Sequence, residues 1–189
     1  MAATDAELVR RALNGHQDAA RDLVERFERP VFNLIVRMVR DPGVAEELAQ
    51  DTFVKAFSHL RSYEPARKFS SWIFRIAHNT TIDYLRRPDR VVSSLDEGGH
   101  GTAEARSLTS AEPGPQAIAE RNELAGLVER AISGLRADYR EALVLRYQEE
   151  LSYEEIAEVL GLPIGTVKSN IHRARAELAA AMRSAGWGG

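Results

Sequence analysis

Apolar residues recur at intervals of three and four along most of the chain, which is the spacing of amphipathic α-helices. Before residue 88 this pattern predicts four helices. The first begins at Asp5, the third runs from about 44 to 60, and the fourth follows Pro65. We expect the second helix to kink or restart at Pro30, because proline removes a backbone donor from a helix interior.

Beyond residue 115 the same spacing predicts helices over 118–135 and 139–147, followed by a helix pair at the carboxyl end. The alternation of apolar and polar residues that is typical of a strand does not compete with these helices. The predicted fold class is therefore all-α, with two small helical domains joined by a flexible linker. The predicted boundaries are domain 1–87, linker 88–115, domain 116–185 and tail 186–189.

The linker differs from its flanks in composition. Its 28 residues include four glycines and three prolines, and they carry two basic against five acidic side chains. Such a segment would span about 95 Å if it were fully extended, but only about 29 Å as a relaxed coil. We therefore expect the two domains to be loosely tethered and able to act at separated places.

Composition argues against several classes of protein. The 189 residues include no cysteine, which excludes disulfide scaffolds, thiolate metal sites and cysteine nucleophiles. No apolar run reaches the roughly 18 residues of a membrane-spanning helix, and the first residues lack the basic and apolar regions of a signal peptide. We expect a cytoplasmic protein without direct membrane insertion.

The net charge of −3 hides two stretches of 18 residues without an acidic side chain, 65–82 and 159–176. Each stretch leaves a basic surface free of neighbouring carboxylates, which suits contact with a phosphate backbone. For one stretch alone, a plain solvated helix face is the alternative. The basic residues of the two stretches are Arg67, Lys68 and Arg75, and Lys168, Arg173 and Arg175.

The second stretch lies in a helix-turn-helix pattern. Ser152 and Glu155 fit a capping box at the start of its first helix, and Gly161 suits the left-handed residue that ends it. The apolar seam of the next helix leaves an opposite face that carries Lys168, Ser169, His172 and Arg175, with Arg173 at its margin. Such a face can enter the major groove and donate to guanine acceptors. An ordinary helical hairpin with a polar face is the alternative.

The first stretch is less specific. We expect Trp72 in the core, because aromatic residues at helical spacing more often pack than stack on bases. Asn79 can both donate and accept, so it can read an unstacked base, although an ordinary surface amide would look the same. Arg146 and Tyr153 flank the helix-turn-helix, where they either anchor phosphates or are simple surface residues.

Three motifs follow one another along the chain. They are AEELAQDTFVKAF at 45–57, FSSWIFRIAHN at 69–79, and LSYEEIA at 151–157 with GTVKS at 165–169 and RAR at 173–175. In this order they resemble the extracytoplasmic-function (ECF) sigma factors, which are compact alternative sigma subunits of bacterial RNA polymerase. The resemblance covers nearly the whole chain. The sequence has Asn170 and His172 where members often carry a basic and a bulkier residue.

The resemblance implies three sets of functional residues. The third predicted helix would bind the clamp helices of the largest polymerase subunit through Gln50, Asp51 and Lys55. The fourth helix and the loop before it would open and read the minus ten element through Lys68, Phe69, Ser70, Ser71, Arg75 and Asn79. The second domain would read the minus thirty-five element through Lys168, Ser169, His172, Arg173 and Arg175, supported by Arg146, Tyr153 and Glu154.

The implied partners are core RNA polymerase, at its clamp helices and flap region, and promoter DNA as duplex and melted strand. An anti-sigma factor that masks the polymerase-binding surface is also implied. In the complex the linker would take an extended path, because domains two duplex turns apart are separated by roughly 70 Å.

Two other classes of function compete with this interpretation. A stand-alone helix-turn-helix regulator would bind duplex DNA tightly without polymerase. An enzyme is disfavoured, because the five histidines are scattered, none form a zinc-ligand pair on one helix, and no glycine-rich phosphate loop occurs. We therefore assign no catalytic residue, no metal and no cofactor.

Overall fold

The computed structural model describes residues 3–87 and 115–187. Within these ranges all regular structure is helical, as the apolar spacing predicted. The first range holds α1 (Asp5–Leu13), α2 (Gln17–Val39), α3 (Pro42–Ser58), the short 3-10 helix η1 (Leu60–Ser62) and α4 (Phe69–Leu85). The second holds α5 (Pro115–Gly134), α6 (Ala137–Tyr147), α7 (Tyr153–Leu160) and α8 (Ile164–Ser184). The predicted linker lies outside the described residues, except for Pro115.

Local sequence signals set the helix boundaries of the first domain. The Thr4 hydroxyl accepts a hydrogen bond from the Glu7 amide and caps α1, and the Asp41 carboxylate accepts one from the Val44 amide and caps α3. The helix does not restart at Pro30, because α2 continues through this residue to Val39. Phe27 and Val31, on either side of the proline, are both buried, so packing of this face holds the helix together.

The core of the first domain lies where α2 packs against α1, α3 and α4. Leu23, Ile35 and Phe74 are fully buried there. An aromatic group, Phe27, Tyr63, Phe69 and Trp72, adds edge-on and tilted ring contacts with centroids 5.2–5.7 Å apart. Trp72 is buried, as expected from the sequence.

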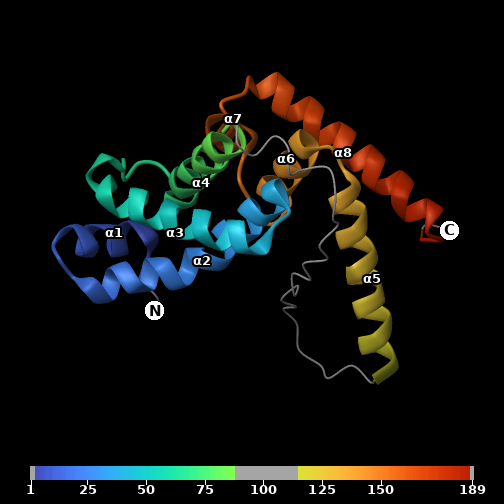
Figure 1. Ribbon diagram of the computed structural model, residues 1–189, viewed down its shortest axis with the longest axis horizontal. Coiled ribbons are helices and arrows are strands. Elements are labelled where there is room, and N and C mark those ends of the chain that lie inside the picture. Colours follow the sequence, from blue (N-terminus) through green and yellow to red (C-terminus); the bar gives the residue numbers. More distant parts are fainter. Residues whose placement is uncertain (1–2, 88–114, 188–189) are drawn as a thin grey trace.

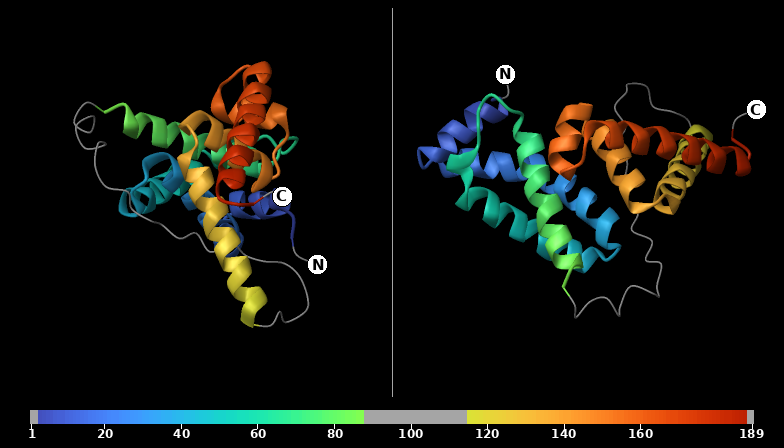
Figure 2. Two further views of the ribbon diagram at one scale, coloured as in Figure 1. Left: turned by 90° about the vertical axis from the view of Figure 1, so that its right-hand side faces the viewer. Right: turned by 90° about the horizontal axis from the view of Figure 1, so that it is seen from above.

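The second domain is organised around α8, which contacts α5, α6 and α7. Around Ala174, α8 packs on α5 and α6 through a separate apolar cluster that also contains Ile132, Leu135, Tyr139 and Leu143. The amino-terminal half of α5 extends away from the rest of the molecule (Figure 1; Figure 2). None of the described helices is both long and apolar enough to span a bilayer.

The two domains pack directly against each other, with α4 lying on α7 and α2 on α6 (Figure 1). One continuous apolar cluster includes Phe74 of the first domain together with Val144, Leu145 and Ile156 of the second. In this structure the two domains are therefore docked, and the linker that joins them lies outside the described residues. The physical reason is that both domains leave apolar surface uncovered, and docking removes that surface from water.

Candidate nucleic-acid interface

The first helix of the helix-turn-helix is fixed at both ends. The Ser152 hydroxyl accepts from the Glu155 amide at 3.1 Å, and the Glu155 carboxylate accepts from the Ser152 amide at 2.7 Å, which completes the predicted capping box. Gly161 ends α7 in the left-handed region at φ +63°. Burial raises the pKa of the Glu155 carboxyl, but hydrogen bonds from Ser152 and Lys68 outweigh it and hold the pKa below its ordinary value.

The second helix, α8, buries one side and presents the other to solvent. Val167, Ile171 and Ala174 are buried on its inner side. The predicted polar face is exposed along its whole length and consists of Lys168, Ser169, His172, Arg173 and Arg175. Asn170, which lies between these residues in the sequence, is buried instead. A row of cations on the solvent side of a helix that packs against the capped α7 has the chemistry of a phosphate and base-edge contact surface.

The Tyr153 ring lies between two cations at the edge of this face. Its centroid is 5.2 Å from the Arg146 guanidinium and 6.0 Å from the Lys168 ammonium. Arg146 also donates to the Leu151 carbonyl at 2.8 Å, which holds the turn between α6 and α7. Arg146 and Tyr153 therefore support the surface, and Glu154 beside them is exposed.

The predicted minus ten residues separate into two groups. Lys68, Arg75 and Asn79 are exposed, and Ser70 is half-buried. Phe69 and Ser71 are buried, at 2% and 7% exposure. Phe69 belongs to the aromatic group of the core, so we remove Phe69 and Ser71 from the set of DNA contacts.

The loop before α4 is held by a tyrosine that the sequence did not single out. The Tyr63 hydroxyl donates to the Arg67 carbonyl at 2.6 Å. Burial raises the pKa of this hydroxyl, and Asp5 raises it further, so the group stays protonated and remains a donor. Tyr63 thereby fixes the backbone that carries Arg67 and Lys68.

The predicted polymerase-binding residues share the outer side of α3. Gln50, Asp51 and Lys55 are all exposed, and Lys55 donates to the Thr80 hydroxyl of α4 at 3.1 Å. Asp51 and Lys55 also line an open cleft of about 160 Å³ between α3 and α4. The described residues contain no group of three or more His, Asp and Glu side chains placed to hold a metal ion.

Ion pairs cross from the first domain to the second at the basic loop. Arg67 pairs with Glu158, and Lys68 pairs with Glu155 at 3.3 Å. In this arrangement two cations of the first acid-free stretch, Arg67 and Lys68, are therefore paired with carboxylates of α7. No local pattern in the chain predicts these pairs, because Arg67 and Glu158 are 91 positions apart.

A second junction joins α2 and α4 to α5 and α6. His78 and Glu141 are half-buried and lie 2.6 Å apart, and buried Arg37 pairs with Glu129 at 3.1 Å. Arg37 and Arg140 also line a cavity of about 10 Å³, room for about one water molecule. Burial lowers the pKa of Arg140, and the neighbouring Arg40 and Arg37 lower it further.

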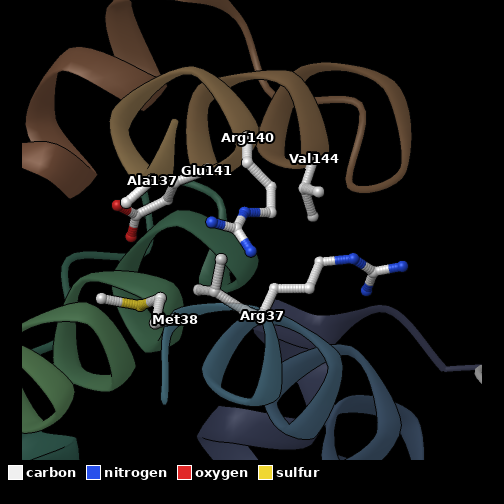
Figure 3. Close-up of a pocket in the computed structure, with 7 residues that line it drawn as sticks. Arg37, Met38, Ala137, Arg140, Glu141 and Val144 are labelled. Carbon is white, nitrogen blue, oxygen red and sulfur yellow. The ribbon is translucent and has the colours of Figure 1, made fainter. Parts of the chain in front are cut away.

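Figure 3 shows how this junction is built. The side chains of Arg140 and Val144 point from α6 toward α2, where Arg37 and Met38 lie. Charged groups from both domains are thus enclosed together with apolar ones, and a buried charge is tolerated where opposite charges and hydrogen bonds accompany it.

Comparison with known families gives two matches that together cover most of the chain. Residues 23–91 match the family model for sigma-70 region 2, and residues 125–178 match that for sigma-70 region 4. The first match spans α3 and α4, and the second spans the helix-turn-helix. A region 2 domain favours a sigma factor over a stand-alone helix-turn-helix regulator.

Solved structures with the same fold include CnrH in complex with the cytosolic domain of CnrY, with a TM-score of 0.64 and 28% identity over 95% of this chain and 97% of that one. They also include the Bartonella quintana sigma factor RpoE in complex with the anti-sigma factor NepR, with a TM-score of 0.63 and 25% identity over 86% and 96%.

Curated relatives agree with the family matches. The chain is 34% identical to the ECF RNA polymerase sigma factor SigW of Bacillus subtilis, over 93% of this chain and 95% of the relative. It is 37% identical to the RNA polymerase sigma-H factor of Pseudomonas aeruginosa, over 90% of both chains. It is likewise 37% identical to the ECF RNA polymerase sigma-E factor of Escherichia coli K12, over 91% of both. The chain therefore belongs to the ECF sigma factors of the sigma-70 family, alternative sigma subunits that direct promoter-specific transcription initiation.

Proposed function

We propose that α8 reads the minus thirty-five element of the promoters that this sigma factor serves. The observation that carries this assignment is the exposed basic face of α8, a helix that packs on α7, which is capped at both ends. The contacts to bases and phosphates are assigned to Lys168, Ser169, His172, Arg173 and Arg175. Tyr153, Arg146 and Glu154 support this face from α6 and α7.

The first domain is assigned to the minus ten element. Lys68 and Arg75 supply cations for the backbone of the melted strand, and Asn79 and Ser70 supply groups that can hydrogen-bond an unstacked base. The exposure of Lys68, Arg75 and Asn79 supports this assignment. Unpairing of the duplex is offset by these contacts, so binding is expected to weaken steeply with added salt.

The outer side of α3 is assigned to the clamp helices of core polymerase, through Gln50, Asp51 and Lys55, and the second domain to the flap region. The protein contributes binding and no covalent chemistry, so it needs no cofactor. An anti-sigma factor is the further partner, because the related RpoE of B. quintana was solved in complex with one.

Reconstitution with core polymerase on a genomic promoter library, followed by sequencing of the transcripts, tests the whole assignment. The expected result is a holoenzyme that starts transcription at a defined set of promoters. Absence of holoenzyme, or of any transcript, would contradict the proposal. The stand-alone regulator would instead bind DNA tightly without core enzyme.

Replacing the cations of α8 is expected to weaken promoter binding selectively. Lys168→Ala or Arg173→Ala should lower holoenzyme affinity for the upstream element by about 5- to 150-fold, because a good base contact contributes about 1–3 kcal/mol. Binding to core polymerase should not change. Electrophoretic mobility shifts on a transcribed promoter measure the effect.

Arg183→Ala is the matched control, because Arg183 is an exposed cation in the last turn of the same helix, outside the assigned face. Loss of core binding in the Lys168 or Arg173 variants would mean that the polymerase and DNA surfaces are misassigned.

Because of the cross-domain ion pairs, we expect the free protein to bind DNA more weakly than it would if Arg67 and Lys68 were not paired with α7. DNA and α7 compete for Lys68 in this arrangement. Glu158→Lys should replace an attraction to Arg67 with a repulsion and strengthen binding of promoter DNA by the free protein about 1.4- to 5-fold, which corresponds to the roughly 0.2–1 kcal/mol expected for exposed charge pairs. Fluorescence anisotropy measures the affinity.

The charge swap Glu158→Lys with Arg67→Glu should restore the pair and return the domains to the docked arrangement. Energy transfer between dyes on cysteines placed at Ala6 and Ala181 reads the domain separation, and the native chain has no other cysteine to label. Glu25→Lys adds the same charge at an exposed position of α2. An equal gain in DNA affinity for Glu25→Lys would attribute the effect to net charge alone.

A further inference from the structure

We propose that Tyr139 is a positioning residue, which holds the Arg173 side chain in place for its contact with promoter DNA. Tyr139 lies in the first turn of α6, 34 positions from Arg173. Its hydroxyl accepts a hydrogen bond from an Nη of Arg173 at 3.2 Å. The inference rests on the proposed role of Arg173 at the minus thirty-five element.

The Tyr139 ring is itself immobilised. It is 5% exposed and packs in the apolar cluster of the second domain, with Ile132, Leu135, Leu143 and Ala174. The Arg136 guanidinium lies 5.1 Å from the ring centroid. Because the ring has little freedom, its hydroxyl is a fixed reference point for any group that binds it.

Arg173, in contrast, is an exposed side chain at the margin of the α8 face. A free arginine side chain populates many rotamers, and ordering it on DNA opposes binding. The hydrogen bond to Tyr139 restricts these rotamers before DNA arrives. The backbone at Arg173 is held close to Tyr139, because the next residue, Ala174, packs in the same apolar cluster as the tyrosine ring.

The role differs from those of the other α8 cations. The Lys168 ammonium lies over the Tyr153 ring, 6.0 Å from its centroid. Arg173 meets the hydroxyl of Tyr139. Removal of that single oxygen therefore tests the proposal, since Tyr139→Phe keeps the ring in the cluster.

The experiment is a double-mutant cycle on the holoenzyme with the full chain. The four proteins are wild type, Tyr139→Phe, Arg173→Ala and the double variant, and the probe is a duplex that carries the upstream element of a promoter the holoenzyme transcribes. Tyr139→Phe should weaken binding about 2- to 10-fold in the wild-type background, the range for losing one pre-ordered side chain. In the Arg173→Ala background it should have no effect.

Three outcomes overturn the inference. If Tyr139→Phe binds the duplex as tightly as wild type while Arg173→Ala binds it more weakly, then Tyr139 has no positioning role, although the DNA contact of Arg173 stands. An equal loss from Tyr139→Phe in both backgrounds indicates a general structural role. Wild-type affinity for Arg173→Ala removes the proposed contact as well.

Tyr147→Phe is the matched control, because Tyr147 ends the same helix and is 54% exposed. It should leave affinity unchanged. Thermal unfolding of Tyr139→Phe should match wild type, because the apolar contacts of the ring remain.

Discussion

Phe74→Ala is expected to destabilise the first domain by about 3–5 kcal/mol, the cost of removing a large buried side chain and leaving a cavity. Phe74 is fully buried, in the middle of α4. It also belongs to the apolar cluster that continues into the second domain, so the loss should weaken domain docking together with folding. Urea denaturation followed by circular dichroism measures the change in the free energy of unfolding.

Val54→Ala is the control for this substitution. Val54 is 66% exposed on α3, so its truncation removes little buried surface and should change stability by less than about 0.5 kcal/mol. Comparable losses from the two variants would mean that Phe74 does not belong to a closely packed core.

The stability of the protein is expected to fall as the pH rises from about 5 to 8 because of one glutamate. Burial raises the pKa of Glu149 to about 7 from an ordinary value of 4.5, against a smaller lowering by Arg37. Between these two values the folded chain holds a proton that the unfolded chain has released, so the free energy of unfolding decreases with rising pH. At about 1.4 kcal/mol per pKa unit, the change from 4.5 to about 7 corresponds to at most about 3.4 kcal/mol, and the partial solvent exposure of Glu149 reduces this figure.

Glu149→Gln should remove this part of the pH dependence, because the amide mimics the protonated carboxyl and does not titrate. Denaturation curves at pH 5.5 and pH 8 should therefore converge for the variant and differ for wild type. Glu150→Gln, at the exposed neighbouring position, should behave as wild type. An unchanged pH slope in Glu149→Gln would place the titrating group elsewhere.

The helices and the helix-turn-helix followed directly from the sequence. Intervals of three and four between apolar residues gave the helices, and Ser152, Glu155 and Gly161 gave the limits of α7. The exposed side of α8 was also predictable, because a buried seam at helical spacing determines which residues lie opposite it. These features depend on residues within a few positions of one another.

The minus ten surface was only partly predictable. Lys68 and Asn79 are exposed as expected, but Phe69 and Ser71 lie in the core. Phe69 and Ser71 lie in the first turn of α4. The sequence motif there does not show on which side of α4 the other helices pack, so it does not show which residues become buried. The burial of Phe69 follows from the places of Phe27 and Tyr63, which belong to α2 and to the segment after η1.

By itself, the sequence determined the all-α class, the capped helix α7 and the basic face of α8. Only the tertiary structure decided that the two domains dock, that Arg67 and Lys68 pair with α7, and that Tyr139 holds Arg173. Helix periodicity and caps arise from backbone hydrogen bonds over three or four residues. The pairs across the domains join residues 63 to 92 positions apart, and the choice of partner among 28 acidic side chains is made by packing.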